Sequence, residues 1–124
     1  MRNATVLLVF EELQDLENYG SILCTLGCSL RLCSSVAEGI KAPETENFSL
    51  VIVSQGTPAF EGRQALERSI LLRPNVPVLI IARALDVHCY LDAMDLGAID
   101  YLERPGPQDA AWVVNAQIQR ASAA

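Results

Sequence analysis

Apolar residues in this chain fall into short continuous runs separated by stretches in which they recur at helical spacing. The runs predict five β-strands at Thr5–Phe10, Leu30–Ser34, Leu50–Val53, Val78–Ile81 and Ile99–Leu102. Continuous apolar runs of this length are typical of strands that are covered on both faces, as in a parallel sheet.

Helical periodicity follows four of these runs clearly. Leucines recur from Leu13 to Leu26, and Gly27 suits a left-handed helix stop. Glu61–Leu72 is predicted as a helix, as is the segment that Asp86 caps and Gly97 closes. After Pro107, apolar residues again share one helical face, which predicts a last helix to the end of the chain.

The helix after the second strand is less regular. Ser35 with Glu38 three residues later forms the pattern of a capping box. Gly39 weakens the helix and Pro43 is predicted to end it. We therefore expect 42–47 to be an irregular, exposed connection.

Five units of a strand followed by a helix predict one α/β domain over residues 1–124. Its fold class is flavodoxin-like: a doubly wound, five-stranded parallel sheet with helices on both faces. Ligands of such sheets bind at the carboxyl ends of the strands. Here those ends carry Phe10 to Glu12, Ser54, Ala82 and Arg104.

The net charge and the lengths of the apolar runs argue against several classes of partner and location. The 124 residues carry 9 basic and 15 acidic side chains, a net charge of -6, which disfavours direct contact with nucleic acid or with an anionic membrane. No apolar run approaches the ~20 residues of a membrane span, so we expect a cytoplasmic protein.

The cysteines and the single histidine, which are common metal ligands, do not follow the spacing of a known metal site. The four cysteines show no CxxC spacing and are predicted as small buried hydrophobes in a reducing compartment. His88 is expected on the surface of a helix. We therefore predict no metal and no cofactor.

Three stretches resemble a known family: Val6 to Glu12, Ser54-Gln55-Gly56-Thr57-Pro58 with Gly62, and Met94 to Pro105, which reads M-D-L-G-A-I-D-Y-L-E-R-P. They are similar to the receiver domain of bacterial response regulators, and the resemblance covers nearly the whole chain in order and spacing. The resemblance implies two-component or phosphorelay signalling, with a phosphoacceptor at position 54 and a switch aromatic at Tyr101.

The family's reactive residues are absent. Ser54 replaces the phosphoacceptor aspartate, Phe10 and Glu11 replace a pair of aspartates, Ala82 replaces a Thr or Ser, and Arg104 replaces a lysine. Aspartyl phosphorylation needs a carboxylate and a divalent cation. With only Glu11, and perhaps Glu12, left to bind a cation, we expect Mg²⁺ binding to be weak or absent.

Two arrangements are predicted for this degenerate phosphoacceptor pocket. We expect Arg104 to pair with Glu11 or donate to Ser54, and thereby to close the pocket permanently. Because Ala82 has a small side chain, we also expect Tyr101 to point inward in one fixed arrangement.

These features predict a pseudo-receiver that is not an enzyme and acts through protein contacts. A symmetric homodimer through the last helix-strand-helix face is one candidate, with a surface formed by Ala98, Tyr101, Trp112 and Val113. Two alternatives stay open. One is residual phosphoryl chemistry on Ser54 or Glu11, and the other is the N-terminal regulatory domain of a transcription regulator.

Overall fold

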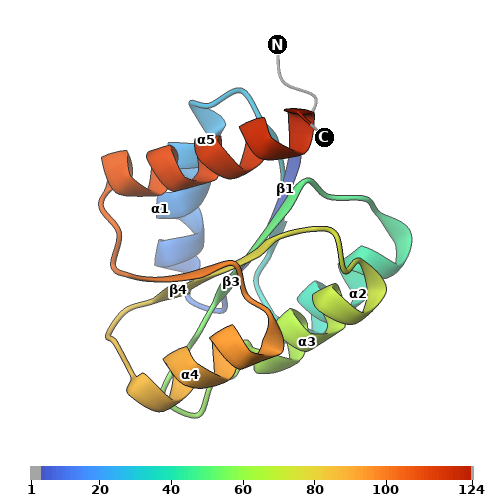
Figure 1. The fold of residues 1–124 in the computed structure, drawn as a ribbon. Coiled ribbons are helices and arrows are strands. Elements are labelled where there is room, and N and C mark those ends of the chain that lie inside the picture. Colours follow the sequence, from blue (N-terminus) through green and yellow to red (C-terminus); the bar gives the residue numbers. More distant parts are fainter. Residues whose placement is uncertain (1–3, 124) are drawn as a thin grey trace.

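The strands form a single parallel sheet in the computed structural model, which describes residues 4–123. The strands are β1 (Thr5–Val9), β2 (Ser29–Cys33), β3 (Leu50–Ser54), β4 (Val78–Ala82) and β5 (Asp100–Glu103), in the order β2-β1-β3-β4-β5 (Figure 1). This is the predicted flavodoxin-like order, and each strand lies within one residue of its predicted bounds at either end. Residues 1–3 and 124 of the predicted domain lie outside the description.

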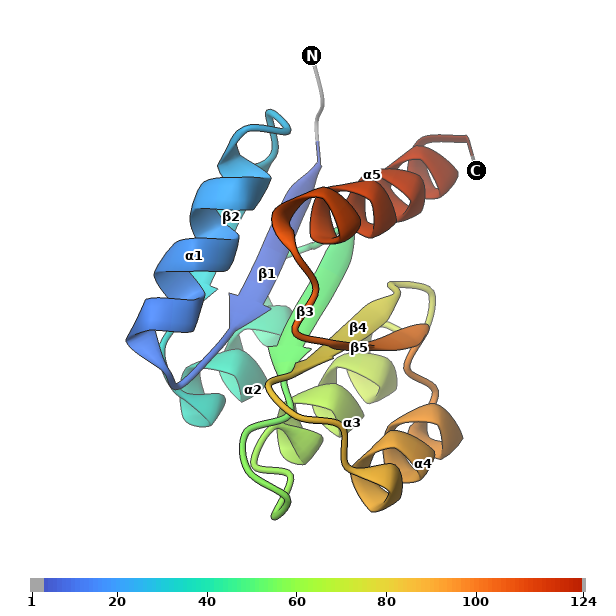
Figure 2. The same ribbon diagram turned by 90° about the vertical axis from the view of Figure 1, so that its left-hand side faces the viewer.

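Five helices cover the two faces of the sheet. They are α1 (Leu13–Cys24), α2 (Val36–Thr45), α3 (Arg63–Leu72), α4 (Val87–Leu96) and α5 (Pro107–Ala123). Helices α1 and α5 lie on one face, while α2, α3 and α4 lie on the other (Figures 1 and 2). No helix in the described part of the chain is long and apolar enough to cross a membrane.

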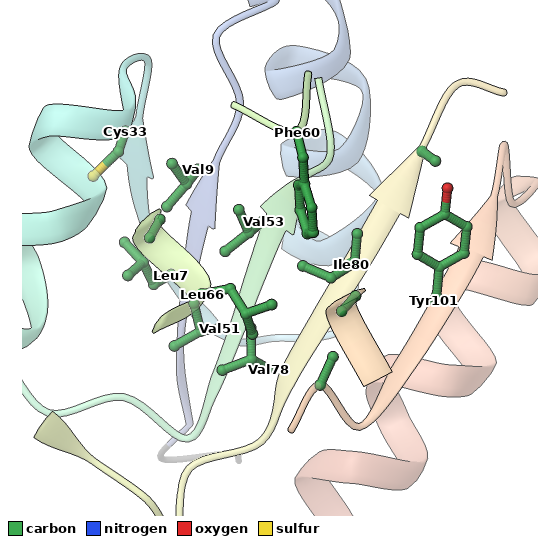
Figure 3. Packing of buried hydrophobic residues seen from close by; sticks show 14 of the residues in the cluster. Leu7, Val9, Cys33, Val51, Val53, Phe60, Leu66, Val78, Ile80 and Tyr101 are labelled. Atoms are coloured by element: carbon green, nitrogen blue, oxygen red, sulfur yellow. The ribbon is translucent and has the colours of Figure 1, made fainter. Parts of the chain in front are cut away.

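Alternate residues of the strands face two separate cores, because successive side chains of a strand point to opposite faces. Val6, Leu8 and Ile52 pack beneath α1 and α5. Leu7, Val53 and Ile80 pack beneath α2, α3 and α4, and Figure 3 shows the side chains of this second core. Both faces of the sheet are therefore buried, as the continuous apolar runs predict.

The predicted helix caps are confirmed. Ser35 begins α2 and its hydroxyl accepts a hydrogen bond from the Glu38 N–H at 3.2 Å. The Asp86 carboxylate caps α4 by accepting from the Cys89 N–H at 2.9 Å, and Gly97 ends α4 in the left-handed conformation. Gly27, two residues after the C-cap of α1, also has a positive φ.

The prediction that α2 ends at Pro43 is wrong, because α2 continues to Thr45. A proline lacks the N–H that would bond to the carbonyl four residues earlier. Pro43 lies in the last turn, so only that one bond is missing before the helix ends. Ala42 and Pro43 are buried, and Glu44 forms an ion pair with Arg68 of α3 at 3.3 Å. Packing against α3 therefore keeps this turn helical.

Gly39 has a packing role in α2. A Cβ placed on it would lie 2.6 and 2.7 Å from the two methyl carbons of Val9 in β1. The absence of a side chain lets α2 approach the end of β1 closely, so Gly39 fixes the height of this helix above the sheet.

We expect Gly39→Ala to lower the free energy of unfolding by about 1–3 kcal/mol, because overpacking outweighs the gain in helix propensity. Urea denaturation measures the change. Gly106→Ala is the control, since nothing lies within 4 Å of its added Cβ. In a double-mutant cycle, Val9→Ala should recover part of the loss. A Gly39→Ala protein as stable as the parent would contradict the close approach.

Candidate functional site

Four loops meet where the strands end, at the edge of the sheet predicted to carry the site. Because β1, β3, β4 and β5 are neighbours, the residues after them lie side by side: Glu11 and Glu12 follow β1, Ser54 ends β3, Arg83 follows β4 and Arg104 follows β5. The chain passes from β1 to β2 on one side of β1, and then from β2 to β3 on the other side, so the strand order reverses here and this edge is the switch point of the topology.

An acidic cavity of about 290 Å³ opens at this edge. Its charged lining consists of four carboxylates, Glu11, Glu12, Asp15 and Glu61, and one base, Arg83; Ser54, Gly56 and Thr57 also line it. The expectation that Glu11 and Glu12 are the only acids left is therefore wrong, because α1 contributes Asp15 and the loop after β3 contributes Glu61.

A second cavity of about 260 Å³ lies beside the first and has the opposite charge balance. Its charged lining is Arg83, Arg104 and Asp15, and Ser54, Ala82, Phe10 and Tyr19 complete its wall. Ser54, Asp15 and Arg83 line both cavities and form the boundary between them.

The ion pair in the site joins Arg83 and Asp15, and Arg104 takes no part in it. The Arg83 guanidinium donates to both Asp15 carboxylate oxygens, at 2.8 and 3.3 Å. Within residues 4–123, Arg104 makes no hydrogen bond with Glu11 or Ser54. The predicted closure of the pocket by Arg104 is therefore wrong. Arg83 directly follows the strand-end residue Ala82, but no pattern in the sequence favours it over Arg104.

Phe10 belongs to the core beneath α1 more than to the site. Its side chain is 1% exposed and stacks on Tyr19 of α1, with ring centroids 5.4 Å apart. Burial also raises the pKa of the Tyr19 phenol. An aromatic ring therefore occupies a position where the resemblance implies a carboxylate, and it contributes no charge there.

The loop after β3 is held by its own hydrogen bonds. The Ser54 hydroxyl accepts from the Gly56 N–H at 3.2 Å. The Glu61 carboxylate accepts from the N–H and the hydroxyl of Thr57, both at 2.7 Å, and these bonds lower the pKa of Glu61. Gly62 is required because a Cβ on it would lie 2.0 Å from the Ser54 carbonyl oxygen.

Tyr101 points inward, as predicted, and its ring lies in the core beneath α3 and α4 (Figure 3). Its hydroxyl donates to the side-chain carbonyl of Gln55 and accepts from the Asp86 N–H at 3.2 Å. Gln55 is itself 2% exposed, and Tyr90 contacts the Tyr101 ring edge-on. Burial raises the pKa of the Tyr101 phenol, so it stays protonated at neutral pH.

The predicted interaction surface of the last third is only partly present. Trp112 is 75% exposed on α5, but Ala98 and Tyr101 are buried and Val113 is half-buried. Tyr101 therefore acts inside the protein and not as a surface contact. His88 is exposed, as predicted.

The four cysteines differ in exposure, and Cys28 is half-buried. Cys33 and Cys89 are buried as predicted, and burial raises the pKa of the Cys89 thiol to about 11. Cys24 is exposed, which contradicts the prediction, because it lies on the outer face of the last turn of α1.

Comparison with known proteins assigns the fold. No protein-family model matches the chain. A response regulator receiver domain protein (CheY-like) of Methanospirillum hungatei superposes with a TM-score of 0.89 over 98% of both chains, at 21% identity. A receiver domain protein of Clostridium thermocellum has a TM-score of 0.83 and 27% identity, over 97% of this chain and 98% of that one.

The sequence of the chain is also similar to part of a bacterial regulatory protein. The transcriptional regulatory protein ZraR of Escherichia coli K12 is 25% identical over 103 residues, which make up 83% of this chain but 23% of that protein. The chain therefore spans less than a quarter of the length of this relative.

We expect Tyr101→Phe to lower the free energy of unfolding by about 1–3 kcal/mol, because the buried Gln55 carbonyl and the Asp86 N–H both lose their partner. Tyr90→Phe is the matched control. Its hydroxyl makes no hydrogen bond within the described chain, so we expect a change below about 0.5 kcal/mol. Urea denaturation of both variants distinguishes them, and equal losses would show that the Tyr101 hydroxyl bonds add nothing.

Proposed function

We propose that this chain is a pseudo-receiver, that is, a receiver domain of the response-regulator type that is not phosphorylated on an aspartate and catalyses no reaction of its own. It acts in two-component or phosphorelay signalling through protein contacts. The observation that carries the proposal is Ser54. It stands at the end of β3, at the centre of the site, where the family resemblance implies the phosphoacceptor aspartate.

The chemistry of Ser54 supports this. An acyl phosphate forms only on a carboxylate, and a serine hydroxyl is a poor nucleophile without a base to remove its proton. The hydrogen bond recorded for the Ser54 hydroxyl comes from the Gly56 N–H, a donor that cannot act as a base. Carboxylates line the same cavity, but none within residues 4–123 bonds to Ser54.

The residues present do not fit the Mg²⁺ that the family implies. Mg²⁺ is usually held by one or two carboxylates that are free to bind it, with water and phosphate oxygens completing the octahedron. Both oxygens of Asp15 accept from Arg83, both oxygens of Glu61 accept from Thr57, and Phe10 is apolar. Among the described residues, no three His, Cys, Asp or Glu side chains are grouped to hold a metal ion.

The contacts of Tyr101 support the proposal, because they hold its side chain inward without a bound phosphoryl group. Ala82 has no hydroxyl to follow a phosphoryl group, and Gln55 and the Asp86 N–H already hold the tyrosine inward. A switch needs a ligand that binds its two states differently. With Tyr101 held by groups of the protein itself, the α4 and β5 region is presented in one state.

The partner is then a protein of the signalling pathway. A homodimer that uses the exposed Trp112 of α5 remains one form of this proposal. The length of the curated relative also favours a role as the regulatory domain of a longer protein, such as a transcription regulator. The net charge of -6 disfavours direct contact of this domain with nucleic acid or with an anionic membrane.

A second candidate is residual phosphoryl chemistry, because Ser54 and Glu11 line the same cavity. A small-molecule phosphodonor, acetyl phosphate with Mg²⁺, distinguishes the two by intact mass. We expect no added phosphoryl group in the parent protein. An added group that disappears in Ser54→Ala, or in Glu11→Gln, would overturn the pseudo-receiver.

A further inference from the structure

A third cavity lies at the opposite edge of the sheet from Ser54, where β4 and β5 begin. Its volume is about 360 Å³, larger than that of either cavity beside Ser54. Figure 2 shows the loops that lead into β4 and β5 at this edge, away from the arrowheads of the strands. We call it the amino-edge cavity, and its lining consists of Ile70 of α3, residues 74–77 before β4, Gly97 and Ile99 before β5, and Gln117 and Arg120 of α5.

The walls of this cavity are largely apolar. Ile70 and Val76 line it, and both also pack against the core beneath α2, α3 and α4. Pro74 and Pro77 add the apolar surface of their rings, and Ile99, which is 42% exposed, lies across from the loop that carries them. Small-ligand sites are mostly apolar, with a few polar groups that orient the ligand. The lining therefore favours a ligand with an apolar body.

The polar side chains of the cavity favour an anion. Arg120 supplies a guanidinium, Asn75 and Gln117 supply amides, and there is no Asp or Glu among the described residues that line it. No salt bridge within residues 4–123 involves Arg120. Interaction with the helix dipole explains a cation near the end of α5, but it does not explain the apolar cavity beside that cation. A guanidinium matches a carboxylate through two parallel hydrogen bonds, so a carboxylate is the anion that fits one arginine best.

The cavity is formed by backbone that is already held in place. The Val76 N–H donates to the Arg73 carbonyl at 3.0 Å and closes a turn in the loop before β4, and the two prolines of this loop restrict it further. The Ile99 N–H donates to the Val78 carbonyl at 2.7 Å, which attaches the loop before β5 to β4. Walls held in advance lose little conformational freedom when a ligand binds, which favours affinity.

We propose that the amino-edge cavity binds a small carboxylic acid with an apolar body, such as an aryl or short alkyl acid. The body lies against Ile70 and Ile99, and the carboxylate pairs with Arg120. An amine would find no acid in this lining, and a ligand rich in phosphate would find a single base and apolar walls. The inference goes beyond the proposed function, because it gives the domain a small-molecule ligand at the edge of the sheet away from Ser54.

The test titrates the domain with phenylacetate and, separately, with hexanoate, and follows the backbone amide signals by NMR. The amides of Gly97, Ile99 and Gln117 should shift and saturate together, with a Kd of about 1 mM or below. If neither acid shifts these amides, the proposal is overturned. Saturable shifts confined to Ser54 and Arg104 would also overturn it, because they would place the acid in the basic cavity beside Ser54.

The charge of Arg120 is tested with a pair of ligands. Arg120→Gln should weaken phenylacetate binding about threefold or more, and should leave the binding of the neutral phenylacetamide unchanged. A general loss of structure would weaken both ligands alike. Arg104→Gln is the matched control, because it removes the same charge at an exposed position on the opposite edge, and it should change neither affinity. Equal losses of phenylacetate binding in the two variants would contradict the site.

The apolar contact is tested at Ile99. Ile99→Ser should weaken phenylacetate and phenylacetamide alike, about threefold or more, because both ligands lose apolar contact with the wall. Leu71→Ser is the control, since Leu71 is 71% exposed on α3 outside the cavity, and it should change neither affinity. Phenylacetate binding that Ile99→Ser leaves unchanged would show that the acid binds elsewhere.

Discussion

The hydroxyl of Tyr101 is the point on which the arrangement of the site depends. It joins the loop after β3, through Gln55, to the first residues of α4, through the Asp86 N–H, while its ring is anchored on β5. Phenol and amide are both neutral, so the bond needs no ion and no bound group to balance it. The two hydrogen bonds hold β5, the loop after β3 and the start of α4 in fixed positions relative to one another. The site is buried, so a polar atom left there without a partner would lower the free energy of unfolding.

The proposed function depends on this interaction, because it holds Tyr101 through groups of the protein itself. In the site, Arg83 forms an ion pair with Asp15, and the uncharged Thr57 donates two hydrogen bonds to Glu61. What remains is a divided edge, acidic on the side of Glu11 and basic on the side of Arg104, with Ser54 between them. The hydrogen bonds of Ser54 and Thr57 and the ion pair of Arg83 hold the loops at this edge in place.

The sequence was sufficient for the elements of the fold and for the edge of the sheet at which the site lies. Continuous apolar runs identify strands buried on both faces, and capping residues such as Asp86 act locally, so both can be recognised from adjacent positions. The continuation of α2 past Pro43 could not be predicted, because it depends on packing against α3. The choice of Arg83 over Arg104 likewise depends on the paths of two loops, and the burial of Gln55 depends on Tyr101, 46 positions later.

The residues that helix α4 buries fully, Cys89 and Ala93, have small side chains, and this affects how the native protein fluctuates. Burying an alanine and a cysteine removes much less apolar area from water than burying two leucines, so side-chain burial attaches α4 more weakly than α1. Its hydrogen bonds to the rest of the domain lie at the first turn and, through Arg63 and Asp92, in the middle of the helix, whereas Leu96 in the last turn is only partly buried. Local opening should therefore start at the C-terminal end of α4, and the amide protons there should exchange with solvent while the sheet remains intact.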